Sequence, residues 1–139
     1  MKLTGLISFI TPALAITASY DTVYDSRDTS LVGVACSNGD HGLMKRGYNK
    51  FGDLPTFPNI GGTSNIAGWN SPECGTCWNL TYTTQEGEQR MVTITAIDAS
   101  KNGFNIAEAA MNTLTNGHAL DLGVVDVTAV QVLASFCGL

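Results

Sequence analysis

Four cysteines constrain this chain more than any other feature of its sequence, and they lie at Cys36, Cys74, Cys77 and Cys137. Two of them stand three positions apart in the stretch Glu-Cys-Gly-Thr-Cys-Trp, residues 73–78. Such a pair can be a redox dithiol, half of a zinc site, a haem attachment point or the ends of two separate disulfides. The compartment decides among these chemistries, because structural disulfides persist in an oxidising one.

The N-terminus indicates that compartment, because residues 1–18 have the layout of a secretory signal peptide. Lys2 supplies a positive charge, and an apolar stretch runs from Leu6 to Ile16. Alternatives are an N-terminal core strand or a short membrane anchor, but a spanning helix needs about 20 apolar residues. Small residues suited to cleavage follow, and we expect the cut near Ala18 or Ser19. The expected product is one domain, residues 19–139, without membrane attachment.

In a small secreted domain, an even number of cysteines predicts a disulfide framework. A thioredoxin-like dithiol begins a helix, whereas the residues after Cys77 alternate between large apolar and polar types, as in a strand. Haem attachment needs a histidine at position 78, where this chain has Trp78. We therefore expect no metal and no other cofactor. A zinc site formed by Cys36, His41, Cys74 and Cys77 is a minor alternative that would leave Cys137 unpaired.

If Cys74 and Cys77 do not pair with each other, two connectivities remain. They are 36–74 with 77–137, and 36–77 with 74–137, and the sequence pattern does not choose between them. Each bridge closes a long loop, for which the chain-entropy relation gives roughly 4 kcal/mol of stabilisation.

The charge balance argues against nucleic acid as a partner. With 12 acidic and 7 basic residues, the chain has a formal net charge of −5, whereas nucleic-acid binders carry a clustered basic surface. Lys45, Arg46 and Lys50 form too small a group to provide one. Only 14% of residues are charged, so the surface suits uncharged polar ligands.

Short strands and turns dominate the predicted secondary structure. We expect strands at residues 31–36, 78–84, 90–98 and 124–133, with the second and third joined as a hairpin. Residues 42–47 are expected to form a helical turn, and residues 49–72 a long ordered loop. A helix is predicted to begin near Asn105, which would cap it with Glu108 three residues on, and to end at Gly117. Closing such strands into a small barrel would bury their edges.

Four sequence blocks resemble the signature of the cerato-platanin family of small secreted fungal proteins. They read CSNGDHGLM (36–44), FPNIGG (57–62), IAGWNSPECGTCW (66–78) and ID…GFN (97–98, 103–105). The resemblance covers essentially the whole mature chain, with all four cysteines in order. It implies a mainly β fold with one or two short helices, a six-stranded double-psi β-barrel similar to the first domain of expansins. It also implies the disulfides Cys36–Cys74 and Cys77–Cys137.

The same resemblance implies a function. Family members bind chitin-type N-acetylglucosamine oligomers, loosen cellulose without hydrolysis and act as elicitors or phytotoxins on plants. The implied partners are therefore these oligomers, cellulose and a plant surface receptor, and the implied location is extracellular, including the fungal cell wall. We expect a monomer or weak self-association. Two other functions are weighed against this one: a weak lytic enzyme, and a surface-active structural wall protein.

Asp98 is the main candidate for contact with sugar. It ends an apolar strand, where an Asx-turn explains an aspartate equally well. The resemblance aligns it with the aspartate that the family shares with expansins, in a polar groove where its carboxylate would accept hydrogen bonds from a glycan. The remaining groove residues implied are Asn38, Gly39, Gly61, Gly62, Ser100 and Asn105. Trp69 would either stack on a sugar ring or pin its own loop.

Glycoside hydrolysis usually needs two carboxylates that face each other across the scissile bond. Only Asp98 has an implied groove position, since Asp40, Asp53 and Glu73 lie in loops, so we expect a binding protein and no catalytic residue. A lytic route through Asp98 alone is the enzymatic alternative. Asn79 begins the sequon Asn-Leu-Thr within a predicted strand, where at most partial glycosylation is expected.

Overall fold

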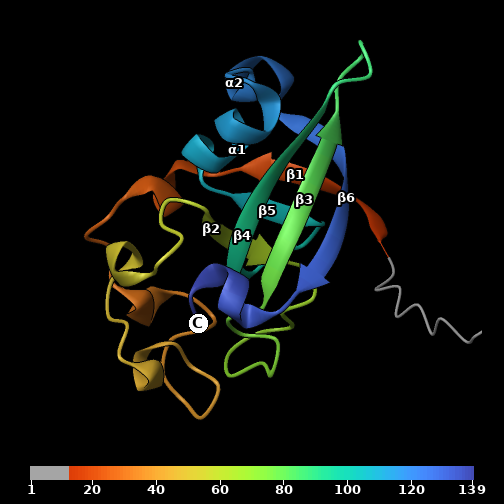
Figure 1. Ribbon diagram of the computed structural model, residues 1–139. Coiled ribbons are helices and arrows are strands. Elements are labelled where there is room, and N and C mark those ends of the chain that lie inside the picture. The colour runs from red at the N-terminus through yellow and green to blue at the C-terminus, as the bar shows by residue number, and fades with distance from the viewer. Residues whose placement is uncertain (1–12) are drawn as a thin grey trace, which may run out of the picture.

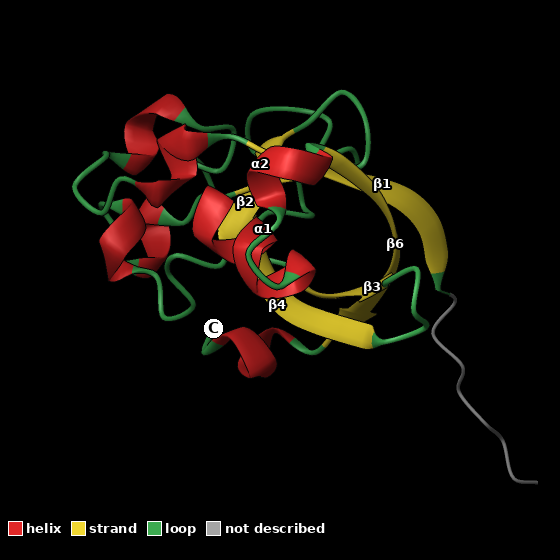
Figure 2. Cartoon of the chain, turned by 90° about the horizontal axis from the view of Figure 1, so that it is seen from above, coloured by secondary structure: helices red, strands yellow, loops and turns green. Residues whose placement is uncertain are grey.

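A computed structural model describes residues 13–139, and shows a closed barrel of six strands (Figure 1). The strand order around the barrel is β1-β5-β2-β4-β3-β6, and Figure 2 looks onto the ring that these strands form. Their bounds are β1 Leu14–Tyr20, β2 Ile60–Thr63, β3 Cys77–Thr83, β4 Gln89–Ala99, β5 Phe104–Ile106 and β6 Val124–Val132.

Two of the strand pairs are parallel, β1 with β5 and β2 with β4, and the other neighbours are antiparallel. Parallel neighbours cannot be joined by a tight hairpin, so the connections cross from one part of the barrel to another. The expected double-psi β-barrel with few short helices and two disulfides is confirmed. The disulfides join Cys36 to Cys74 and Cys77 to Cys137, so the zinc alternative is wrong.

The strands with the clearest alternation of apolar and polar residues lie where the sequence predicted them. β3 and β4 form a hairpin whose register pairs Trp78 with Ile94 and Leu80 with Val92. Trp78 and Leu80 are buried, since alternate side chains of a strand point to the same face. β6 alternates in the same way, with Val125, Val127 and Ala129 buried.

Short helices lie at two places beside the barrel. α1, Glu108–Thr115, and α2, Ala119–Leu122, lie together at one end (Figure 1). Four 3-10 turns, together with loops, fill the chain between β1 and β2: η1 Thr22–Asp25, η2 Leu31–Gly33, η3 Met44–Arg46 and η4 Phe51–Asp53. A fifth, η5 Ala134–Cys137, ends in the second disulfide. η3 confirms the helical turn expected within residues 42–47.

The predicted strand at residues 31–36 is wrong. Its first part is the 3-10 turn η2, because the Ser30 hydroxyl accepts a hydrogen bond from the backbone N–H of Val32. Farther on, the backbone N–H of Ala35 donates to the side chain of Asp98 instead of to a neighbouring strand. The buried residues of this segment, Leu31 and Cys36, therefore belong to a loop packed against the barrel.

The predicted start of the helix is also wrong. Asn105 lies in β5, paired with Ser19 and Gly62, and α1 begins only at Glu108. Asp25, from the distant turn η1, accepts hydrogen bonds from the backbone N–H groups of Glu108 (2.8 Å) and Ala109 (3.0 Å). This carboxylate satisfies the free N–H groups that begin a helix, so no local capping residue is needed.

β1 occupies the end of the segment that the sequence predicted as a signal peptide. Ala18 is fully buried and pairs with Phe104 on one side and Val125 on the other. The predicted cleavage region near Ala18 and Ser19 thus falls within a strand, while residues 1–12 lie outside the described residues. Cleavage itself stays a prediction. Across residues 13–139, the structure has no helix that is long and apolar enough to span a membrane.

Candidate functional site

Asp98 lies near the end of β4, where its carboxylate is partly exposed and ties two distant segments to the barrel. Its Oδ1 accepts hydrogen bonds from the backbone N–H of Ala35 (3.0 Å) and of Ala99 (2.9 Å). Its Oδ2 accepts the hydroxyl of Tyr24 at 3.0 Å. A carboxylate has about four acceptor positions. Three are used here, so one position on Oδ2 is left for another donor.

Tyr24 is the partner that the sequence did not reveal, because it lies 74 residues from Asp98 in the chain. It is buried near the start of the loop-rich segment between β1 and β2, and packs against Phe51. Burial, followed by the Asp98 charge, raises the pKa of Tyr24 above its usual value. The hydroxyl therefore stays protonated and donates to the carboxylate.

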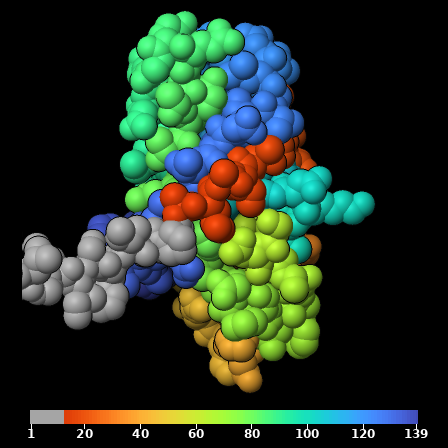
Figure 3. Space-filling model, turned by 90° about the vertical axis from the view of Figure 1, so that its right-hand side faces the viewer, coloured from red at the N-terminus to blue at the C-terminus, as the bar shows by residue number. Residues whose placement is uncertain are grey.

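A cluster of loops next to Asp98 holds Asn38, Gly39, His41, Trp69 and Asn70, and we call it the loop cluster. His41 donates from its backbone N–H to Asn70 Oδ1 (2.8 Å) and from Nδ1 to the Asn70 carbonyl oxygen (3.0 Å). The Trp69 indole N–H donates to Asn38 Oδ1 at 2.7 Å. In Figure 3, chain from around residue 40 (orange) and from around residues 64–76 (yellow-green) lies side by side at the lower end of the molecule.

Ala35 connects the loop cluster to Asp98. Its N–H donates to the Asp98 carboxylate, and its carbonyl oxygen accepts the backbone N–H of Asn70 at 3.4 Å. Predicted residues Asn38 and Gly39 are therefore linked to Asp98 through hydrogen-bonded loops. Gly39 has a φ of +89°, and an added Cβ would lie 2.6 Å from Asn70 Oδ1. A side chain at position 39 would push the two loops apart.

Gly61 and Gly62 lie in β2 and are buried. A Cβ at Gly61 would lie 2.4 Å from the carbonyl oxygen of Asn105, and one at Gly62 would lie 2.8 Å from that of Ala99. Close approach of neighbouring strands thus explains why these positions are glycine. Their contact with a ligand stays a prediction, as does that of Asn105, whose Oδ1 accepts the Ser19 hydroxyl at 3.1 Å inside the barrel wall.

Ser100 faces a shallow hollow of about 440 Å³ beside the end of β4. The hollow adjoins Asp98 through Ala99 and the loop cluster through Ala67, and Lys101 provides its one cationic lining group. Figure 3 shows the turn around residues 100–103 (cyan) projecting beside the 64–71 segment. The lining residues are Ser64, Ile66, Ala67, Ala99, Ser100 and Lys101.

Other polar candidates have separate structural roles. Asp40 pairs with Lys45 at 2.9 Å, and Asp53 accepts the backbone N–H groups of Asn49 and Lys50, which lowers the pKa of Asp53. Asn79 Oδ1 accepts the Thr93 hydroxyl at 2.8 Å, and its glycosylation stays a prediction. Within residues 13–139, the structure brings no three His, Cys, Asp or Glu side chains together as metal ligands.

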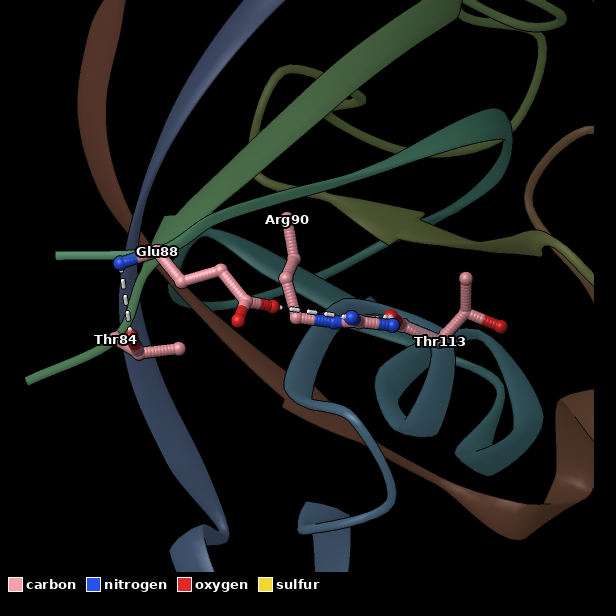
Figure 4. Close-up of polar contacts among 4 residues, drawn as sticks. All are labelled: Thr84, Glu88, Arg90 and Thr113. Carbon is pink, nitrogen blue, oxygen red and sulfur yellow. Dashed lines mark hydrogen bonds and ion pairs between the residues drawn. The ribbon is translucent and has the colours of Figure 1, made fainter. Parts of the chain in front are cut away.

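The opposite end of the barrel is held by a charged contact (Figure 4). Arg90 donates from Nε (3.2 Å) and Nη2 (3.0 Å) to the carbonyl oxygen of Thr113 in α1, and from Nη1 to Glu88 at 3.3 Å. The Glu88 N–H in turn donates to the Thr84 hydroxyl at 3.1 Å. This contact fixes the β3–β4 hairpin to α1, and none of the predicted binding residues takes part.

Fold and site together define a small, disulfide-linked double-psi barrel with a shallow polar surface at one end. Comparison with known proteins gives the family. The cerato-platanin family model matches residues 16–139, so the chain belongs to the cerato-platanin family.

Individual relatives agree with this assignment. The heat-stable 19 kDa antigen of Coccidioides posadasii is 47% identical over 128 residues, which cover 91% of this chain and 84% of the relative. The crystal structure of cerato-platanin 2 from M. perniciosa superimposes with a TM-score of 0.86 at 48% identity, covering 91% of this chain and all of the other. The solution structure of the fungal elicitor cerato-platanin gives 0.76 at 44% identity, covering 88% and 96%. None of these three names denotes an enzyme.

Proposed function

We propose that this protein is a secreted, non-hydrolytic carbohydrate-binding protein that takes up N-acetylglucosamine oligomers along the surface between Asp98 and the loop cluster. The observation that supports this most strongly is the position of Asp98, whose carboxylate is held at the rim with one acceptor position on Oδ2 unused. A sugar hydroxyl or an acetamido N–H is a suitable donor for that position. Affinity should be modest, because such hydrogen bonds largely replace bonds to water.

Binding fits the site better than cleavage does. The Asp98 carboxylate already accepts two backbone N–H groups and the Tyr24 hydroxyl, so most of its acceptor positions hold the fold together. Asp40 and Asp53 have the separate partners described above, so neither is arranged with Asp98 as the carboxylate pair that glycosidases use. Loosening of wall polysaccharide would then arise from competition for hydrogen bonds between glycan chains, without bond cleavage.

The names of two relatives support a proposal about the biological setting. One structural relative is described as a fungal elicitor, and another relative is an antigen, which is consistent with exposure outside the fungal cell. We propose the same for this protein, with secretion directed by the predicted signal peptide and with recognition by a plant surface receptor.

The test is an NMR titration of the oxidised protein with N-acetylglucosamine tetramer and with cellotetraose, with product analysis of the same samples. We expect amide shifts around residues 35–41, 64–71 and 98–103, and intact sugars. New reducing ends or anhydro-sugars would establish the lytic alternative. Saturable self-association without sugar-dependent shifts would favour the surface-active structural alternative.

Asp98→Asn is the informative variant. Asparagine keeps one oxygen for the backbone N–H groups of Ala35 and Ala99, so the loops should stay in place while the charge is lost. We expect weaker binding of the tetramer. Asp25→Asn is the matched control, because Asp25 also ties distant segments together but does so at the start of α1. Equal effects of the two variants on binding would contradict the role proposed for Asp98.

A further inference from the structure

Trp69 has an unusual combination of exposure and fixation. Trp69 is 63% exposed, whereas Trp78 in the barrel is 3% exposed. The indole has a single polar group, its N–H, and this group already donates to Asn38 Oδ1 at 2.7 Å. The part of the indole ring that faces solvent is therefore aromatic carbon. This part of the ring does not donate hydrogen bonds to water.

The backbone on both sides of Trp69 is also fixed. Asn70 has a φ of +60°, a conformation that asparagine tolerates better than most residues. Its side-chain oxygen accepts the His41 N–H, and the N–H of Ser71 donates to the carbonyl oxygen of Gly68 at 3.3 Å. The ring is thus held in a tight turn, with little orientational freedom left to lose on binding.

Glycine at position 39 lets the backbone approach one edge of the ring closely. A Cβ there would lie 3.1 Å from Trp69 Cζ2, so any side chain at this position would meet the indole. Two neighbouring residues thus hold Trp69 in place: Asn38 accepts its indole N–H, and Gly39 leaves room for its ring. An apolar residue that is exposed only by chance does not need such support.

We propose that Trp69 is a stacking platform for one pyranose ring of a β-linked N-acetylglucosamine oligomer, at a subsite separate from Asp98. A pyranose has an apolar face of C–H groups and a rim of hydroxyls, and aromatic side chains offer a large rigid surface to such a face. The inference rests on the proposed function and adds the ring contact that orients the oligomer.

The hollow beside Ser100 is lined by residues that are near both subsites in the sequence. Ala67 lines it two residues before Trp69, and Ala99 lines it next to Asp98. An oligomer that stacks on Trp69 would cross this hollow to reach the unused Oδ2 position of Asp98. A ligand long enough to contact both subsites should bind more tightly, so we expect affinity to rise between the dimer and the tetramer.

The experiment follows the two indole N–H signals by NMR while N-acetylglucosamine tetramer is added. The Trp69 signal should shift with the same saturation curve as the amides around Asp98. The Trp78 signal is an internal control, since its N–H donates to Thr76 Oγ1 inside the molecule. Trp69→Phe identifies the Trp69 signal and retains an aromatic ring.

Affinity measurements on variants complete the test. We expect Trp69→Ala to bind the tetramer about tenfold more weakly, and Trp69→Phe to lose about threefold or less. Asn38→Ala retains the indole ring of Trp69 but removes the hydrogen bond that orients it, so we expect an intermediate loss of tetramer affinity. This variant tests the proposal even if Trp69→Ala folds poorly. Phe136→Ala is the matched control, because Phe136 is 71% exposed and lines a different hollow with Val130 and Leu133.

The outcomes separate the two proposals. Shifts around Asp98 with an unmoved Trp69 signal and unchanged affinity of Trp69→Ala and Asn38→Ala would overturn the stacking platform and leave carbohydrate binding intact. In that case Trp69 only pins its loop, and its substitution should lower stability alone. Absence of shifts at both subsites, with either tetramer, would overturn the proposed function and the platform together.

Discussion

Residues 77–133 and residues 21–76 satisfy their backbone hydrogen bonds in different ways. In the first region β3 pairs with β4 and with β6 through continuous ladders. Within residues 21–76 the structure has one strand, β2, and the chain is held by 3-10 turns, by side chains that bind backbone and by the disulfide Cys36–Cys74. Local alternation shapes the first region, whereas contacts distant in sequence shape the second, and the candidate site depends on the second.

The largest effect should come from the disulfides. Replacing Cys36 and Cys74 by alanine should lower the free energy of unfolding by about 4 kcal/mol, because the bond closes a long loop in the unfolded chain. Hydrogen exchange should show lost protection in residues 34–44 and 66–76, with protection in β3 and β4 retained.

The pair Cys77 and Cys137 is the comparison. It joins β3 to η5, so its replacement by alanine should cost a similar free energy but expose β3. If both double variants lose protection evenly over residues 21–133, the two regions unfold as one unit and the contrast between them does not hold.

Asp98→Ala should have the next largest effect. It leaves the N–H groups of Ala35 and Ala99 and the hydroxyl of Tyr24 without their acceptor, at an expected cost of about 3 kcal/mol. Asp98→Asn should cost about 1 kcal/mol, and Asp25→Ala, which removes a helix-capping carboxylate, also about 1 kcal/mol. Urea unfolding measures all three. A loss for Asp98→Ala no greater than that for Asp25→Ala would mean that water replaces the carboxylate.

A smaller effect is expected at the opposite end of the barrel. Arg90→Ala removes two hydrogen bonds to Thr113 (Figure 4) and should lower the free energy of unfolding by about 1 kcal/mol. Glu88→Ala removes only an exposed ion pair and should change it by less than about 0.5 kcal/mol. Thermal unfolding can rank the two, and neither should alter sugar binding. A change in tetramer affinity for Arg90→Ala would place part of the binding surface at the β3–β4 hairpin, away from Asp98.

Substitution of Tyr24 should have the smallest effect on the free energy of unfolding at neutral pH. Its effect should appear mainly at alkaline pH. The pKa of Tyr24 is raised in the folded protein, so above about pH 10 the unfolded chain loses a proton that the folded chain retains. Stability from this source is complete below the unfolded pKa and falls as pH rises beyond it. Tyr24→Phe should remove that fall. Ultraviolet titration should show one of the four tyrosines ionising only on unfolding.

The same contrast explains what the sequence could predict. β3 was predicted from its alternation of apolar and polar residues, β4 as the return strand of its hairpin and β6 as the final strand before Cys137. The cysteine pairing came from the family resemblance. β2 and β5 were missed, since Ile-Gly-Gly-Thr and Phe-Asn-Ile are too short to show a period and become strands only through their partners. The helix cap was missed because its acceptor, Asp25, lies 83 residues before Glu108.

The candidate site also contains residues that the sequence predicted and residues that it did not. Asp98 was expected at the end of a strand, and the structure places it there. Its partners Tyr24 and Ala35 are 74 and 63 residues away, so no local pattern shows them. The exposure of Trp69 also could not be read from the sequence, because it depends on the loop around Asn38 and Gly39 folding beside it.

The position of β1 has a consequence for maturation. Six residues of β1, Leu14–Ser19, pair with β6, and a signal-peptidase cut after Ala18 would remove five of them. β6 would then become an open edge carrying Val125 and Val127, and open edges pair readily with strands of other molecules. A cut upstream of Leu14 would leave the barrel closed. The choice of cleavage bond would therefore determine whether the released protein stays a separate molecule or associates with other copies through its open β6 edge.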